Sequence, residues 1–332
     1  ETGVLRAVGE PADRFGEDYL RVLRGLRFAG RFDLEIEPAT RQALIEATAG
    51  LPHLSAERIR EELMKVLSRG RGPRSSPAAA PTSGPPSTAL DLYAECGVLD
   101  HWFPELVPIA TDRATWREHL GTVDAIPEHR PLLRLARLLV PLGLRGEPEA
   151  TGAPGPGTSE DESVARLMER LRFSNAERRA VGTLVALYLP FPSPLDSAAH
   201  IRAWLSAVDG RWRDLFRLHI GGARTSDRDW QRVVAASFRT VHSEILARPP
   251  LAIRDLAIDG GDLLELGLEA GPLVGLMLEE LLEQVLEDPD RNERDALVAE
   301  AERLIELGAL AGSPGGGDPA AGSGGGEGAP GV

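Results

Sequence analysis

The residues best suited to chemistry lie in one short run near the start of the chain, at positions 17–28. Two carboxylates, Glu17 and Asp18, precede Arg21 by about one helical turn. Side chains three or four positions apart are neighbours on a helix, so Glu17 can pair with Arg21 while Asp18 and Arg21 converge on one small partner. The other side carries the apolar spacing of an amphipathic helix, at Tyr19, Val22, Leu23 and Leu26. The run therefore predicts a helix with a buried face and a charged face.

The charged face has the right groups to recognise a nucleobase. An ionised Asp only accepts hydrogen bonds, and an Arg only donates them. Cytosine and adenine present an exocyclic amine beside a ring-nitrogen acceptor, so Asp18 can take the amine while Arg21 donates to the ring nitrogen. Uracil and guanine reverse this pattern and would leave polar groups unpaired. The alternative is an ordinary surface ion pair near the start of a helix, where acidic residues favour the helix dipole.

The sequence around this run contains further blocks in a recognisable order. They are Gly3–Pro11, Arg14–Phe15, Glu17–Arg21 with Arg27–Ala29, Ser55–Leu63, Ala94–Leu99 with Pro104–Leu106, Arg170–Asn175, Asp259–Leu268, and Gly271–Gly275 continuing to Glu287–Asn292. Together they resemble the bacterial CCA-adding enzymes, class II tRNA nucleotidyltransferases whose class also contains the bacterial poly(A) polymerases. The resemblance covers most of residues 1–305.

This resemblance implies a nucleotidyltransferase that adds C and A to tRNA 3′ ends from CTP and ATP. Asp18 and Arg21 would hydrogen-bond the incoming base, and Glu17 would orient Arg21. Arg24 and Arg27 would support nucleotide binding. The implied fold is an extended, curved array of helical neck, body and tail modules that holds tRNA, and the blocks around the run predict a helix packed behind the nucleotide-reading helix.

Members of the family carry a catalytic head before these blocks, with an Asp-x-Asp pair that holds Mg²⁺. The sequence begins after the position of that head, so we expect the head to be missing or on another chain. Phosphoryl chemistry of this kind needs metal-holding carboxylates. The only comparable pair, Asp288 and Asp290, flanks a proline at a predicted helix end and is interpreted as a helix stop. We therefore expect no catalytic and no metal-binding residues in this chain, and no transfer activity from it alone.

Two further groups of residues are candidate contacts to RNA. Arg170, Arg172 and Arg178 flank Ser174, which is a good N-cap residue, and they form either a basic patch or a solvated helix end. Gly271 and Gly275 border a turn whose free N–H groups can cradle a phosphate. The alternative for this turn is a plain helix start, because proline is common at the first position of a helix.

Composition restricts the class of protein. The 332 residues hold 37 basic and 51 acidic side chains, a net charge of −14, although residues 1–75 are nearly balanced with 13 and 12. A local arginine face can still bind RNA phosphates, with salt-sensitive affinity. The single cysteine, Cys96, excludes an internal disulfide and a Cys cluster for zinc. No apolar run has membrane length, so we expect a cytoplasmic protein that binds neither membrane nor DNA.

Leu, Ala, Arg and Glu recur at helical spacing and strand signals are rare, so the sequence predicts an all-α fold. Clusters of Pro, Gly and Ser suggest five segments. These are a neck at 1–69, a flexible linker at 70–88, a helical body at 89–237, a helical tail at 238–311 and a disordered terminus at 312–332.

Two alternatives to a CCA-adding enzyme stay open at this point. One is a fragment of a bacterial poly(A) polymerase, a group that the first 70 residues also resemble. The other alternative is a non-catalytic RNA-binding partner of a split enzyme, which would meet its head as a separate chain.

Overall fold

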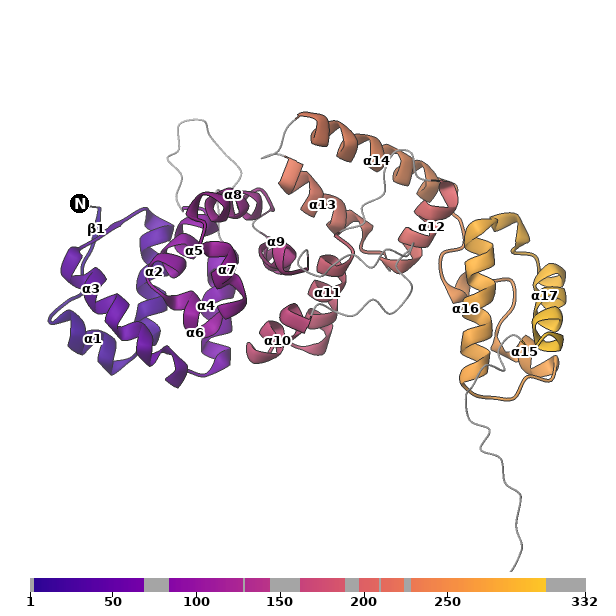
Figure 1. Cartoon of the computed structure of the whole chain (residues 1–332), viewed down its shortest axis with the longest axis horizontal. Coiled ribbons are helices and arrows are strands. Elements are labelled where there is room, and N and C mark those ends of the chain that lie inside the picture. Colours follow the sequence, from indigo (N-terminus) through magenta and orange to yellow (C-terminus); the bar gives the residue numbers. More distant parts are fainter. Residues whose placement is uncertain are drawn as a thin grey trace, which may run out of the picture. The chain divides into compact units, whose positions relative to one another are not determined.

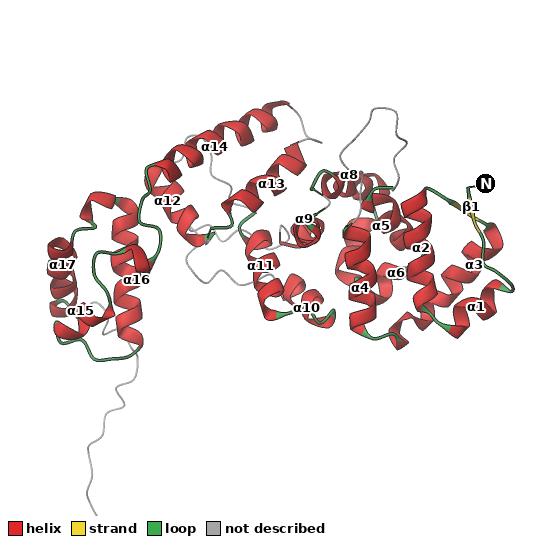
Figure 2. Ribbon diagram, turned by 180° about the vertical axis from the view of Figure 1, so that it is seen from behind, coloured by secondary structure: helices red, strands yellow, loops and turns green. Residues whose placement is uncertain are grey.

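The computed structural model confirms the predicted all-α fold (Figures 1 and 2). It describes residues 3–68, 84–127, 129–143, 162–188, 197–208, 210–223 and 228–308. The predicted disordered terminus at 312–332 and most of the predicted linker at 70–88 lie outside these residues. Two compact units are present, residues 1–249 and residues 250–332.

The first unit contains fourteen α-helices among its described residues. They are α1 (Pro11–Glu17), α2 (Leu20–Phe32), α3 (Pro38–Ala47), α4 (Ala56–Leu67), α5 (Pro86–Glu95), α6 (Val98–Trp102), α7 (Val107–Ala110), α8 (Arg113–Asp124), α9 (Pro131–Gly143), α10 (Glu162–Arg170), α11 (Asn175–Ala186), α12 (Ala198–Ala207), α13 (Trp212–Ala223) and α14 (Arg228–Leu246). Short 3-10 helices occupy Thr48–His53 and Pro104–Leu106. Strands β1 (Val4–Leu5) and β2 (Glu35–Ile36) pair in parallel, with Val4 opposite Glu35.

Helix α2 forms the centre of the N-terminal part of this unit. Its apolar residues Val22, Leu23 and Leu26 are at most 1% exposed, as the helical spacing predicted. They pack towards α4 and α5, and the helix ends at Asp33, which adopts a left-handed conformation with φ 52°. Asp is one of the few residues besides Gly that tolerates this conformation. The predicted helix behind α2 is α4, which follows Ser55.

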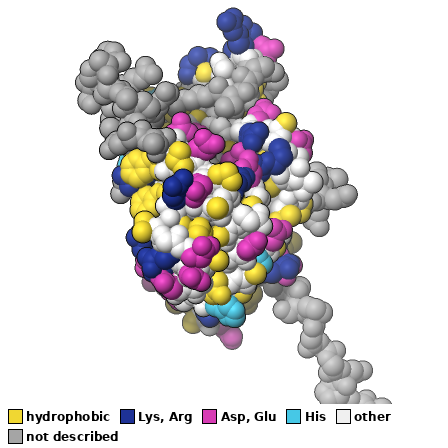
Figure 3. All heavy atoms as spheres, turned by 90° about the vertical axis from the view of Figure 1, so that its left-hand side faces the viewer, with side chains coloured by type: hydrophobic (Ala, Val, Ile, Leu, Met, Phe, Trp, Pro, Cys, Tyr) yellow, Lys and Arg dark blue, Asp and Glu magenta, His cyan; other side chains and the backbone are white. Residues whose placement is uncertain are grey.

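The surface at the end where α1 and α3 lie mixes basic and acidic side chains with scattered apolar ones (Figure 3). Ion pairs account for much of this mixing. Arg6 pairs with Glu37 at 2.8 Å, and Arg14 pairs with Glu17 at 2.7 Å. Exposed pairs of this kind contribute little to stability. They do reduce the number of arginines on this face that are available to an anionic ligand.

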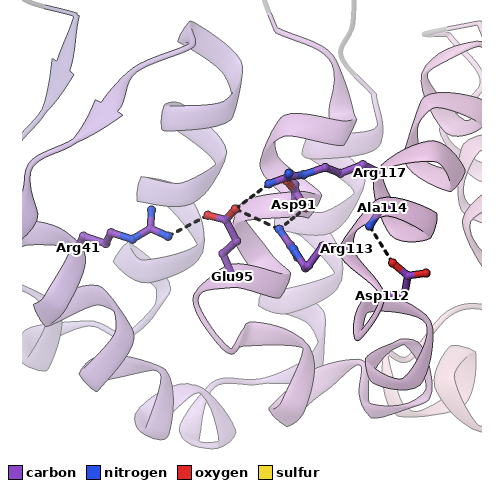
Figure 4. A network of polar contacts seen from close by, with 7 residues as sticks. All are labelled: Arg41, Asp91, Glu95, Asp112, Arg113, Ala114 and Arg117. Atoms are coloured by element: carbon purple, nitrogen blue, oxygen red, sulfur yellow. Dashed lines mark hydrogen bonds and ion pairs between the residues drawn. The ribbon is translucent and has the colours of Figure 1, made fainter.

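A charged network joins the N-terminal helices to the segment that follows residue 84 (Figure 4). Glu95 on α5 accepts hydrogen bonds from Arg41 on α3 and from Arg113 and Arg117 on α8, at 2.8 to 3.2 Å. Asp91, one turn earlier on α5, binds the same two α8 arginines. Several charges that share partners hold their geometry better than an isolated pair. The regions interpreted as neck and body therefore pack into one unit.

Helix α14 runs across residues 237 and 238, where the sequence suggested the boundary between body and tail. The structure divides into two compact units between Pro249 and Pro250, and the predicted bounds of body and tail stay predictions. Proline lacks a backbone N–H and cannot continue a helix interior, so this pair is a natural end for the helical run.

The second unit is a small helical module built from a 3-10 turn at Ile253–Asp255, α15 (Gly260–Glu265), α16 (Pro272–Glu287), a 3-10 turn at Pro289–Arg291 and α17 (Arg294–Glu306). Its core contains Leu263, Met277, Leu281, Val285 and Ala301, all fully buried. The predicted helix stop is confirmed, because α16 ends at Glu287 and the Asp288 side chain accepts from the Asp290 N–H at 3.2 Å. In the part of the chain that the structure describes, no helix combines the length and apolarity that a bilayer crossing requires.

Two glycines of α2 provide a matched test of its packing. A Cβ on Gly30 would lie 2.7 Å from Ala89 Cα on α5, whereas the heavy atom nearest to a Cβ on Gly25 would be Leu44 Cδ2, at 3.6 Å. We expect Gly30→Ala to destabilise the first unit by about 1–3 kcal/mol through overpacking. Gly25→Ala should stabilise it by about 0.5–1 kcal/mol, because alanine favours the helix. Urea unfolding followed by tryptophan fluorescence measures this unit, since all five tryptophans precede residue 250. Equal midpoints for the two variants would contradict the close approach of α2 and α5.

Candidate nucleotide-binding site

Asp18 lies at a break between two helices. The continuous helix predicted over residues 17–28 is wrong at its start, because α1 ends at Glu17 and α2 begins at Leu20. Asp18 is extended, with φ −156° and ψ 104°, and its Oδ1 accepts a hydrogen bond from the Leu20 N–H at 3.0 Å. This contact satisfies one of the free N–H groups at the start of α2. A short acidic side chain that bonds the following backbone is thus what interrupts the helix.

Tyr19 anchors the break against the protein. Its ring lies so close to Gly50 that any Cβ at that position would overlap it, and it lies 6.1 Å from the His53 ring between centroids. Arg21 remains one turn after Asp18, since its N–H donates to the Asp18 carbonyl oxygen at 2.9 Å. Arg21 therefore keeps its place one turn after Asp18 despite the change in helix boundary, and convergence of the two side chains on one ligand stays a prediction.

Arg58 on α4 is the principal cation at Asp18, and the sequence interpretation did not assign it a role. Its Nη2 donates to both carboxylate oxygens of Asp18, at 2.9 and 3.2 Å. Partial burial alone would raise the pKa of Asp18, but the Leu20 N–H, the Arg58 guanidinium and nearby Arg21 together hold this pKa below its usual value. Asp18 is therefore a fixed, ionised acceptor. The useful signal in the sequence was the Ser55–Leu63 block, which places an arginine on the helix behind α2.

Glu17 holds Arg21, as the spacing predicted. Its Oε2 accepts hydrogen bonds from Arg21 Nη1 and from Arg14 Nη1, and the same Arg21 nitrogen donates to the Arg14 carbonyl oxygen at 2.6 Å. The Arg21 hydrogen bond is the largest cause of the lowered pKa of Glu17. A guanidinium has five N–H donors, so binding through Nη1 leaves other donors of Arg21 for a ligand.

The remaining arginines of α2 differ sharply from one another. Arg24 is exposed, which agrees with a role towards a ligand. Arg27 is only 9% exposed, and its Nε donates to Glu62 on α4 at 2.7 Å. Glu62 is 2% exposed and also accepts from Lys65 at 2.9 Å. Arg27 therefore holds α2 against α4, and its predicted support of nucleotide binding stays a prediction.

The arginines around residue 174 are largely committed to protein partners. Arg170 donates to Glu105 at 2.6 Å, and Arg178 donates to Asn175 at 2.8 Å. Arg172 is exposed in a left-handed conformation with φ 55°, and its carbonyl oxygen accepts from Arg60. The predicted N-cap at Ser174 is confirmed and forms a full capping box with Glu177. Arg172 is thus the most accessible of the three arginines predicted to contact RNA.

Gly271 and Gly275 belong to the second unit. Gly271 occupies the N-cap position of α16, Pro272 is the first helical residue, and Gly275 has open space where a Cβ would stand. The predicted helix start is confirmed. A phosphate contact at this turn stays a prediction.

No three His, Cys, Asp or Glu side chains come together as a metal site within the described residues. These residues therefore do not fit the magnesium site of the implied head. Burial lowers the pKa of His119 to about 4 and that of His219 to about 3, so both imidazoles are neutral near pH 7.

Two family models match the chain. One is described as the probable RNA and SrmB-binding site of polymerase A and matches residues 33–76, which include α3 and α4. The other is described as a putative second domain of tRNA nucleotidyltransferases and matches residues 241–301.

Curated relatives are named CCA-adding enzymes. The enzyme of Limosilactobacillus fermentum is 27% identical over 307 residues, which are 91% of this chain and 64% of that enzyme. The enzyme of Streptococcus suis is 49% identical over 67 residues, which are 20% of this chain and 17% of that enzyme. The match to the Limosilactobacillus fermentum enzyme thus includes nearly all of this chain, but the chain spans only about 64% of the length of that enzyme.

A solved structure shows the same fold. The CCA-adding enzyme of Bacillus stearothermophilus, determined in complex with CTP, superimposes with a TM-score of 0.60 at 19% identity. The superposition covers 93% of this chain and 67% of that enzyme. Together with the relatives and family models, it confirms the resemblance that the sequence blocks indicated.

The buried pair of Arg27 and Glu62 gives a stability prediction. Glu62→Ala should destabilise the first unit at pH 7 by about 3–5 kcal/mol, because it leaves a buried guanidinium unpaired. Burial favours a higher pKa for Glu62, but bonds from Lys65 and Arg27 hold this pKa below its usual value. The stabilisation is therefore present at neutral pH and is lost as pH falls through the folded-state pKa.

The double variant Arg27→Met with Glu62→Leu is the matched control, since it removes both charges and keeps apolar volume. It should recover most of the loss in urea unfolding at pH 7. A loss as large in the double variant as in Glu62→Ala would show that packing, not the unpaired charge, causes the effect.

Proposed function

We propose that this homologue of CCA-adding enzymes selects CTP and ATP and holds tRNA during addition of nucleotides to tRNA 3′ ends. The observation that carries the proposal is the geometry of Asp18 and Arg21. Asp18 is an ionised acceptor held at a helix break, and Arg21 is a donor held one turn later by Glu17. Relatives named CCA-adding enzymes support the reaction, and the family model described as a putative domain of tRNA nucleotidyltransferases supports tRNA as the substrate.

Base selection follows from the hydrogen-bonding types of the two side chains. Asp18 accepts from the exocyclic amine of cytosine or adenine, and a free N–H of Arg21 donates to the adjacent ring nitrogen. Uracil or guanine would turn a carbonyl towards Asp18 and a ring N–H towards Arg21. An acceptor would then face an acceptor, and a donor would face a donor. Arg58 keeps Asp18 charged and fixes its direction, while Arg24 lies exposed on α2.

The match at residues 241–301 supports a tRNA nucleotidyltransferase rather than a poly(A) polymerase. RNA binding by the first unit is supported by the polymerase A family model over residues 33–76. We propose that tRNA is the RNA, that Mg²⁺ is bound by the catalytic head of the family, and that this head is supplied by sequence beyond these 332 residues.

Asp18→Asn tests base selection in a protein that includes the head. The asparagine side-chain oxygen can still accept the bond from the Leu20 N–H, so the fold should persist, but the amide loses the charge that pairs with Arg58. We expect preference for CTP and ATP over UTP and GTP to fall at least about tenfold, in line with the ~1–3 kcal/mol that a mismatched polar group costs. Asp13→Asn, an exposed acid on α1, is the matched control and should leave the preference unchanged. Unaltered discrimination in Asp18→Asn would refute the proposed role of the pair.

The isolated polypeptide should bind tRNA without extending it. Incubation with magnesium, CTP, ATP and a tRNA lacking its CCA end is expected to give no longer product on a sequencing gel, because the described carboxylates form no metal site. Restored extension on joining the catalytic head would support the proposal. Extension by the 332-residue chain alone would overturn the division of labour.

A further inference from the structure

The exposed face of α14 has no part in the proposed nucleotide site. Helix α14 packs against α12 and α13 (Figures 1 and 2) through buried residues that include Val234, Ser237 and Val241. With 3.6 residues per turn, the opposite side presents Arg232, Arg239, His242 and Leu246, at spacings of seven, ten and fourteen residues. All four are exposed, and Leu246 is 69% exposed.

This face is basic in a protein whose net charge is −14. The helix has two acidic residues, and both are occupied. Asp229 pairs with Arg232 at 2.8 Å, and Glu244 is turned towards Arg202 on α12, with the two charged atoms 2.9 Å apart. Arg239 has only alanine, histidine and serine three and four positions away, so the helix places no acid beside it. A guanidinium in this position attracts anions without a competing carboxylate on its own helix.

An aromatic residue precedes Arg239 in the sequence, and its side chain points about 100° around the helix from that of Arg239, at the edge of the same exposed arc. Phe238 is 39% exposed, and its ring stacks on His242 at 5.9 Å between centroids with an interplanar angle of 7°. Phe216 meets it edge to face at 5.1 Å, and Trp212 lies at 6.2 Å. Arg213 covers the Trp212 ring at 4.3 Å. Phe238 is thus held in place from the protein side while part of its surface remains open to solvent.

We propose that this face of α14 binds an RNA strand, with Arg239 on a backbone phosphate and Phe238 stacked on a base. RNA offers both anionic phosphates and flat apolar bases, and this side of α14 offers both a guanidinium and a partly exposed flat ring. An acidic protein segment would satisfy the arginine but would supply no planar partner for the exposed ring. That the RNA is tRNA rests on the proposed function, whereas the position of the surface rests on α14 alone.

Binding of a fluorescent tRNA transcript to the full 332-residue chain, titrated at several salt concentrations, tests this surface. Arg239→Ala should weaken binding and reduce the slope of log K against log salt by about 1. Phe238→Leu keeps an apolar side chain but loses the flat ring, and affinity should fall about five- to a hundredfold. Arg166→Ala is the matched control, because Arg166 on α10 is also exposed but is paired with Glu162. The affinity of this variant for tRNA should equal that of the parent chain.

Arg239→Lys keeps the charge and should retain most of the affinity, which separates electrostatics from any folding defect; tryptophan fluorescence and helical circular dichroism check the fold. The α14 proposal is overturned, while the proposed function stands, if the parent chain binds tRNA and both variants fold and bind tRNA as tightly as the parent. The two variants are Arg239→Ala and Phe238→Leu. If the parent chain fails to bind tRNA at all, the proposed function itself is overturned. If polyglutamate displaces the labelled tRNA as effectively as unlabelled tRNA does, the proposal of an RNA ligand is overturned in favour of an acidic protein partner.

Discussion

The bond between the Asp18 carboxylate and the Leu20 N–H decides the form of the candidate site. It ends α1 and starts α2, and it turns an acid that would otherwise lie along a helix surface into a fixed group at a helix start. Arg58 reaches this carboxylate from forty positions further along the chain. The site therefore depends on α4 being packed behind α2, and that packing depends in turn on the buried contact between Arg27 and Glu62.

Arginine serves three different purposes in this protein. Some arginines, such as Arg27, are buried in ion pairs that connect helices. Others, such as Arg113, belong to exposed or half-buried networks that join neighbouring segments. A smaller number, including Arg24 and Arg239, are exposed with no acid pairing identified for them among the described contacts. This division explains how a chain with a net charge of −14 can present local basic surfaces to RNA.

The two halves of the proposed function draw on different kinds of observation. Base selection depends on donor and acceptor patterns within a few residues of Asp18, and it requires only local geometry. Holding a large RNA requires surfaces spread over the chain, and the matched family models at residues 33–76 and 241–301 lie outside the base-reading run. The proposed function thus combines a compact reading site with separate surfaces for the polynucleotide.

The sequence by itself determined the helical class, the buried face of α2, the cap at Ser174, the helix start at Pro272, the stop at Asp288 and the resemblance to CCA-adding enzymes. These features arise from spacing and from capping chemistry, which act within a few residues. Only the tertiary structure decided the helix break at Asp18, the pairing of Arg58 with Asp18, the burial of Arg27 and the single unit formed by the regions interpreted as neck and body. Local spacing could not predict that Arg24 is exposed and Arg27 is buried. That difference arises because α4 packs against α2 at Arg27.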